Sequence, residues 1–78
     1  MSMVITVYGP GCARCYETER VVRNVLAELR HDADLQKVSD YQAMAAAGVM
    51  ATPAVAIDGV MKLSGRIPTR DEVRAWLT

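Results

Sequence analysis

The sequence lacks several features that would place it in large classes of protein. Among its 78 residues are no phenylalanine, one tryptophan, one histidine and two cysteines. Two cysteines are too few for a disulfide-rich scaffold. Together with one histidine, they fall short of the four ligands of a typical structural zinc site. Hydrophobic residues at 51% and charged residues at 23% are typical of a globular protein.

Charge and hydrophobic runs exclude further classes. Nine basic and nine acidic residues cancel, so the chain has no basic excess to bind a nucleic-acid backbone or an anionic membrane. No apolar run approaches the roughly 18 residues that span a bilayer. The N-terminus has neither the basic region nor the cleavage signal of a secretory leader. We therefore expect a cytoplasmic protein with one domain over residues 1–78.

Short apolar runs bounded by turn residues predict alternating strands and helices. Strands are expected at 3–8, 34–38, 54–57 and 60–63, the last two joined by a tight Asp58-Gly59 turn. Helices are expected from 12 to about 31, from 40 to just before 48, and from 70 onward. The predicted fold is α/β, in the order β-α-β-α-β-β-α. Its mixed four-stranded sheet is flanked by three helices, and its first unit is a right-handed parallel crossover.

Local signals define the ends and faces of the helices. Capping boxes are expected at Ser39 with Gln42 and at Thr69 with Glu72. An apolar face on the first helix is predicted from a spacing of three or four residues; it comprises Cys15, Val22, Val25, Leu26 and Leu29. The inner face of the last helix is expected to hold Val73, Trp76 and Leu77. Core-filling side chains are expected at Met44, Met50 and Met61, with Met50 set apart by its closeness to Thr52-Pro53.

The most informative motif is Cys12-Ala13-Arg14-Cys15, at the junction of the first strand and the first helix. The unpaired amides and the dipole at a helix N-terminus stabilise a thiolate there. Cys12 is therefore the predicted nucleophile. Cys15, one turn further, is the predicted resolving thiol, which attacks a mixed disulfide at Cys12. Arg14 is either a cation that lowers the pKa of Cys12 further or a solvated arginine on an exposed turn.

A second feature is Thr52-Pro53, directly before the third strand. Only a bond that precedes proline adopts the cis form at low cost. Taken alone, Pro53 fits an ordinary trans residue that begins a strand. Taken together with the cysteine pair and the element order, it predicts a cis bond. Such a bond would turn the backbone of Thr52 toward the cysteines, where a substrate could pair as an added strand.

These motifs resemble those of the small thioredoxin-like redox-active disulfide proteins of prokaryotes, glutaredoxin-sized members of the thioredoxin superfamily. The resemblance covers residues 4–77. It rests on Gly11-Cys12-Ala13-Arg14-Cys15, Gly48 to Val55, Ile57-Asp58-Gly59 and Gly65-Arg66-Ile67-Pro68. It implies a compact thioredoxin-like fold, a thiol–disulfide oxidoreductase without a cofactor of its own, and Pro53 as the cis-proline. Substrate contacts are expected at Gly11, Arg14, Thr52 and Pro53.

Departures from the family patterns bear on the partners. The lysine that precedes the glutaredoxin motif is absent, and the glutaredoxin Gly-Gly pair appears only as Gly65-Arg66. These differences favour a thioredoxin-reductase-like flavoenzyme over glutathione as the electron donor, with disulfide-containing proteins as substrates. The alternative is a carrier or binding module in which the two thiolates hold a soft metal ion, Cu(I) or Zn. Small copper chaperones, however, follow their first helix with two strands, whereas here a helix precedes the hairpin.

Overall fold

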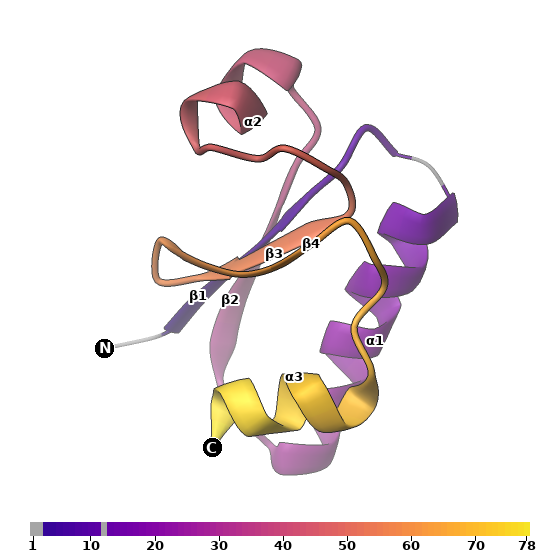
Figure 1. Cartoon of the computed structure of the whole chain (residues 1–78). Helices are drawn as coiled ribbons and strands as arrows, with labels where there is room; N and C mark the ends of the chain where they lie inside the picture. The colour runs from indigo at the N-terminus through magenta and orange to yellow at the C-terminus, as the bar shows by residue number, and fades with distance from the viewer. Residues whose placement is uncertain (1–2, 12) are drawn as a thin grey trace.

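The computed structural model describes residues 3–11 and 13–78, and its elements follow the predicted order (Figure 1). The strands are β1 (Met3–Tyr8), β2 (Ala33–Val38), β3 (Ala54–Ile57) and β4 (Val60–Ser64). The helices are α1 (Ala13–Leu29), α2 (Tyr41–Ala46) and α3 (Arg70–Leu77). Within the described part of the chain, none of these helices has the length and apolar character needed to cross a membrane.

The four strands form one mixed sheet in the order β2-β1-β3-β4. β1 pairs in parallel with β2, as expected for a crossover through α1, and antiparallel with β3. β3 and β4 form the predicted hairpin, with a register shift between Val55 and Ala56. Asp58 and Gly59 both have positive φ, at 50° and 84°, which is the backbone of a primed two-residue turn. The predicted α/β fold, a mixed four-stranded sheet with three helices, is confirmed.

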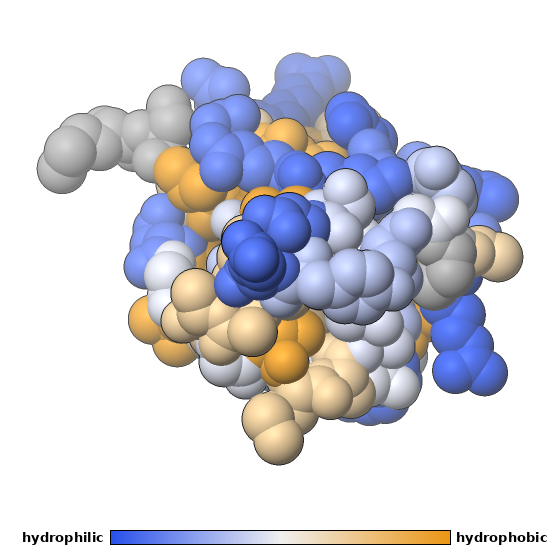
Figure 2. Space-filling model, turned by 90° about the horizontal axis from the view of Figure 1, so that it is seen from above, coloured by the Kyte–Doolittle hydropathy of each residue, from blue (hydrophilic) through white to orange (hydrophobic). Residues whose placement is uncertain are grey.

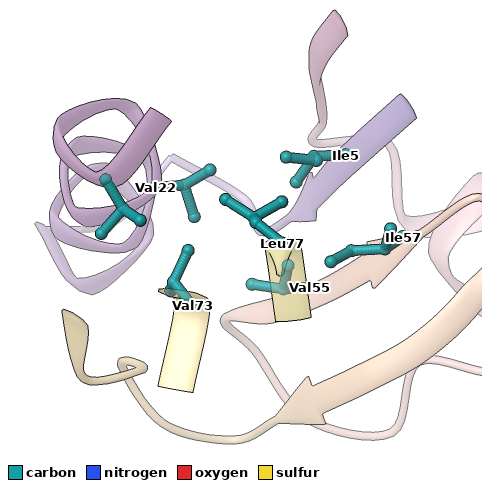
Figure 3. Close-up of a cluster of buried hydrophobic side chains, with 7 residues drawn as sticks. Ile5, Val22, Val55, Ile57, Val73 and Leu77 are labelled. Carbon is teal, nitrogen blue, oxygen red and sulfur yellow. The ribbon is translucent and has the colours of Figure 1, made fainter. Parts of the chain in front are cut away.

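The hydrophobic core lies between the sheet, α1 and α3 (Figure 3). Every residue of β3 is buried, whereas the edge strand β4 alternates between exposed and half-buried residues. The buried cluster draws side chains from β1, α1, β3 and α3: Ile5, Val22, Val25, Val55, Ile57, Val73 and Leu77. Glu28 of α1 forms ion pairs with Arg70 and Arg74 of α3 at the rim of this contact. α2 lies beyond the carboxyl end of β2, on the side of the molecule away from α3 (Figure 1).

The structure corrects one predicted cap and confirms the other. Thr69 and Glu72 form the predicted capping box at the start of α3. The prediction that Ser39 caps α2 was wrong, because the N-cap is Asp40, whose carboxylate accepts a hydrogen bond from the Gln42 amide at 3.1 Å. Ser39 remains in the turn after β2, and α2 begins only at Tyr41. Ser39 and Asp40 both have side chains that can cap a helix, so residue type alone does not decide which of them is the N-cap. The residue at which the backbone becomes helical decides it.

The capping box of α3 also fixes an ionisable pair. The Arg66 guanidinium donates to both carboxylate oxygens of Glu72, at 2.7 and 2.6 Å, and the Thr69 amide donates to one of them at 3.0 Å. The hydrogen bonds from Arg66, followed by the one from Thr69, lower the pKa of Glu72 from its usual 4.5 to about 2. Because the pKa is lower in the folded chain, the stabilisation is complete above pH 4.5 and is lost as the pH falls through about 2.

Replacing Arg66 by methionine is therefore expected to raise the pKa of Glu72 toward its usual value, while the Thr69 amide still holds it somewhat below. The dependence of stability on pH between 4.5 and 2 should become shallower for the same reason. Carbon-detected NMR titration of the side-chain carboxyl measures the pKa directly. Arg20→Met, which removes a 3.7 Å pair with Glu17, is the matched control and should leave Glu72 unchanged. A Glu72 pKa that is unchanged in the Arg66→Met variant would contradict this account.

Candidate functional site

The candidate site forms where three segments meet at one end of the sheet. The antiparallel register places Tyr8, the last residue of β1, opposite Ala54, the first residue of β3. Residues 9–11 after β1 and residues 51–53 before β3 therefore lie at the same end. Val38, the last residue of the parallel strand β2, is opposite Tyr8 on the other side, and its carbonyl accepts a hydrogen bond from the Gly9 amide at 2.9 Å.

Cys15 lies in the first turn of α1, next to this end of the sheet, and its side chain is fully buried. Cys12, the predicted nucleophile, falls outside the described residues. Arg14 is exposed on the same turn, and its carbonyl accepts a hydrogen bond at 2.9 Å from the hydroxyl of Thr18. Thr18 is fully buried, and it is a further residue of the site beyond those predicted from the sequence. Its spacing from Cys15 and Val22, three and four residues, places it on the same inner face.

The segment before β3 supplies the other wall of the site. The Thr52–Pro53 peptide bond is cis. Pro53 is fully buried, and its carbonyl accepts a hydrogen bond from the Gly65 amide at 2.9 Å. Thr52 is half-buried. Gly11 has a φ of 88°, a left-handed backbone that favours glycine, and a Cβ there would come within 3.7 Å of the Tyr16 hydroxyl. Gly11, Cys15, Thr52 and Pro53 are thus gathered at one end of the sheet, whereas the Arg14 side chain lies on the outer surface of α1.

An open, mostly apolar groove of about 330 Å³ adjoins Thr52, between α2 and the segment that leads to β3. It is lined by Tyr41, Met44, Ala45, Val49, Met50, Ala51 and Thr52. Figure 2, which looks down on this end of the molecule, shows apolar surface in pale orange tones across its lower half, with further orange surface toward the upper left. Met44 is buried, as predicted. The expectation that Met50 fills the core was wrong: it is 93% exposed, because it lies at the open groove in the connection between α2 and β3 and not in a helix or strand that packs on the core.

Charged residues beside the site form a short chain of contacts. The Lys37 ammonium, at the end of β2, lies 3.7 Å from the centroid of the Tyr16 ring and 3.6 Å from Glu19. Glu19 also pairs with Arg23 at 2.8 Å, and chiefly this hydrogen bond lowers the pKa of Glu19. Across residues 3–11 and 13–78, no three His, Cys, Asp or Glu side chains gather as a metal-ligand cluster. Only the Glu19–Arg23 contact carries a sequence signal, the i,i+4 spacing.

Comparisons with known proteins agree with this geometry. The family described as "Thioredoxin domain" matches residues 3–78. The chain is 36% identical over 76 residues to a protein named thioredoxin from Methanothermobacter thermautotrophicus, with 97% of this chain and 99% of the relative aligned. It is 38% identical over 75 residues to a protein named thioredoxin from Methanocaldococcus jannaschii, with 96% of this chain and 86% of the relative aligned.

Proposed function

Because the chain belongs to the thioredoxin family, its function is of the thiol–disulfide oxidoreductase kind, and we propose that it reduces protein disulfides through Cys12 and Cys15. One observation carries the proposal: Cys15 is buried in the first turn of α1, at the end of the sheet where Thr52 and Pro53 lie. A thiol at that place, three residues from a second cysteine, is suited to resolve a mixed disulfide rather than to meet substrate first.

The proposed reaction has two exchange steps. The Cys12 thiolate attacks one sulfur of the substrate disulfide, forms a mixed disulfide and releases the other substrate sulfur as a thiolate. The Cys15 thiolate then attacks the Cys12 sulfur, and the bond to the substrate breaks. Two electrons pass to the substrate, its two thiolates take up protons, and the protein is left with a Cys12–Cys15 disulfide. Cys12 directly precedes α1, whose N-terminal dipole favours the thiolate form.

Substrate contacts are proposed at Gly11, Arg14, Thr52 and Pro53. The half-buried Thr52 continues into the apolar groove. Tyr41 is 73% exposed on the rim of this groove, beside the still more exposed Met50. Exposed apolar surface next to a reactive site is typical of a protein-binding face. A disulfide within a protein, flanked by apolar residues, therefore fits this surface better than a small polar disulfide does.

The electron donor proposed for the oxidised form is a thioredoxin-reductase-like flavoenzyme. Gly65, the residue that stands where glutaredoxins have a Gly-Gly pair, uses its amide to bind the Pro53 carbonyl at 2.9 Å. The next residue, Arg66, directs its guanidinium to Glu72. These two residues are therefore engaged within the chain, which supports a donor other than glutathione.

The test is a redox titration of the purified protein. The protein is equilibrated in thiol buffers of graded potential and its free thiols are alkylated. The masses of the products are measured by mass spectrometry, and the metal content is measured on the same sample. A reversible two-electron transition that links Cys12 to Cys15, at roughly −180 to −290 mV, is the expected result. A protein that forms no internal disulfide, and instead holds a soft metal at one ion per one or two chains, would overturn the proposal in favour of the metal carrier.

A further inference from the structure

Gly9 lies directly against the sulfur of Cys15. The residue is buried immediately after β1. A Cβ placed on Gly9 would overlap the Cys15 Sγ and would come to 2.8 Å from the Cys15 Cβ, closer than real carbon atoms approach. The sulfur therefore occupies the space that any other side chain at position 9 would fill.

The space that the Cys15 sulfur occupies requires a glycine at position 9, whereas the backbone conformation there does not. Glycines with a positive φ occur elsewhere in the chain, including Gly48 at 80° and Gly59 at 84°, but Gly9 is not among them. A Cβ on Gly48 or Gly59 would meet no atom within 4 Å. Gly48 thus offers a matched comparison, since alanine there strains the backbone and touches nothing, whereas alanine at position 9 suits the backbone and strikes Cys15.

The backbone of Gly9 is held in place from both sides. Its amide donates to the Val38 carbonyl at 2.9 Å, and the preceding residue, Tyr8, is paired with β2 and with β3. β1 is an inner strand of the sheet, so this end of it has little freedom to retreat. A side chain added at position 9 would therefore displace the Cys15 sulfur rather than the strand.

We propose that Gly9 is a positioning residue for the resolving thiol, a role that rests on the function proposed above. Resolution needs the Cys15 sulfur in line with the mixed disulfide at Cys12, because the new S–S bond forms as the electron pair leaves on the substrate sulfur. A misplacement of about 1 Å can slow a reaction by roughly a hundredfold. Gly9→Ala should slow this second step and leave the first step, the attack by Cys12, at its ordinary rate.

The aromatic disulfide 5,5′-dithiobis(2-nitrobenzoate) separates the two steps in stopped flow, because each releases one coloured thiolate. For reduced Gly9→Ala, we expect the first release at the wild-type rate and the second slowed at least about tenfold, with the Cys12 adduct visible by mass spectrometry. Gly48→Ala should show both releases at wild-type rates. Equal slowing in the two variants, or none in Gly9→Ala, would overturn the positioning role. A wild type with only one release would instead count against the proposed function.

A double-mutant cycle tests the contact itself, even if Gly9→Ala folds poorly. Urea unfolding is measured for the wild type, Gly9→Ala, Cys15→Ala and the double variant Gly9→Ala/Cys15→Ala. Removing the sulfur relieves the closer of the two overlaps beside Gly9, whereas the Cys15 Cβ, 2.8 Å from the added methyl, stays in the alanine variant. The drop in unfolding midpoint caused by Gly9→Ala should therefore be smaller, but not abolished, in the Cys15→Ala background. The same drop in both backgrounds would show that the added methyl strikes something other than the sulfur, and would overturn the proposal.

Discussion

A Cys15→Ser variant is expected to retain its substrate as a stable mixed disulfide on Cys12 instead of releasing it. Serine fits the fully buried position that Cys15 occupies against Gly9, so the fold should persist. Its hydroxyl, however, does not attack a disulfide at neutral pH. Turnover of a protein disulfide should fall at least about a hundredfold, because the first exchange proceeds and the second cannot. Mass spectrometry should show a one-to-one adduct of protein and substrate, and a reducing agent should cleave it.

The matched control for this trap is Cys12→Ser, which removes the proposed nucleophile and leaves Cys15 in place. It should lose turnover to a similar degree but form no adduct, because the remaining thiol is buried. The two variants are therefore expected to lose activity to a similar degree, and only Cys15→Ser is expected to form the trapped complex. An adduct on Cys15 in the Cys12→Ser variant, or full turnover in Cys15→Ser, would reverse or refute the assigned roles.

The largest effect on stability is expected from Ile5→Ala. Ile5 is almost fully buried on β1 and belongs to the cluster that joins the sheet to α1 and α3 (Figure 3). Loss of its side chain removes buried apolar surface and leaves a cavity, at a cost of about 2 to 5 kcal/mol. Folded proteins of ordinary stability have only about 5 to 15 kcal/mol in total. The variant should thus unfold at a much lower urea concentration than the wild type, with a similar denaturant slope.

Val60→Ala is the control, because Val60 is 57% exposed on the edge strand β4. Its loss should change the free energy of unfolding by less than about 0.5 kcal/mol. Comparable losses from the two variants would mean that the cluster around Ile5 does not dominate the core.

Most of the fold could be predicted from the sequence because its elements are bounded by strong local signals. The strands at 3–8 and 54–57 are apolar runs between turn residues, and both were predicted to the residue. The end of the first helix was less certain, since it stops at Leu29 and not near His31. Arg30 adopts the left-handed backbone, with a φ of 51°, that glycine usually provides at this point. Without a glycine there, the sequence has no clear signal for the helix end.

The candidate site could be predicted in part. The spacing of Cys12 and Cys15 and the place of Pro53 before a strand are properties of the sequence. The contact between Gly9 and Cys15 is a tertiary distance, and a glycine beside a proline is equally well explained by a turn. The exposure of Met50 was also beyond sequence reasoning, because methionine is common in cores and only the three-dimensional arrangement shows that residue 50 lies at the surface.

The place of β1 in the sheet has a consequence for the order in which the molecule assembles. β1, the first strand of the sheet along the chain, lies between β2 and β3, and its partner residues in β3 include Ile57, in the last third of the sequence. The parallel pair of β1 and β2 can form early, but one flank of β1 stays unpaired until the hairpin has been made. The entropy cost of bringing β3 back to β1 across the intervening chain arises before the contacts between these two strands can stabilise the sheet. Folding is therefore expected to be slower than for a helical bundle of this size, and to be completed only when the last third of the chain is available.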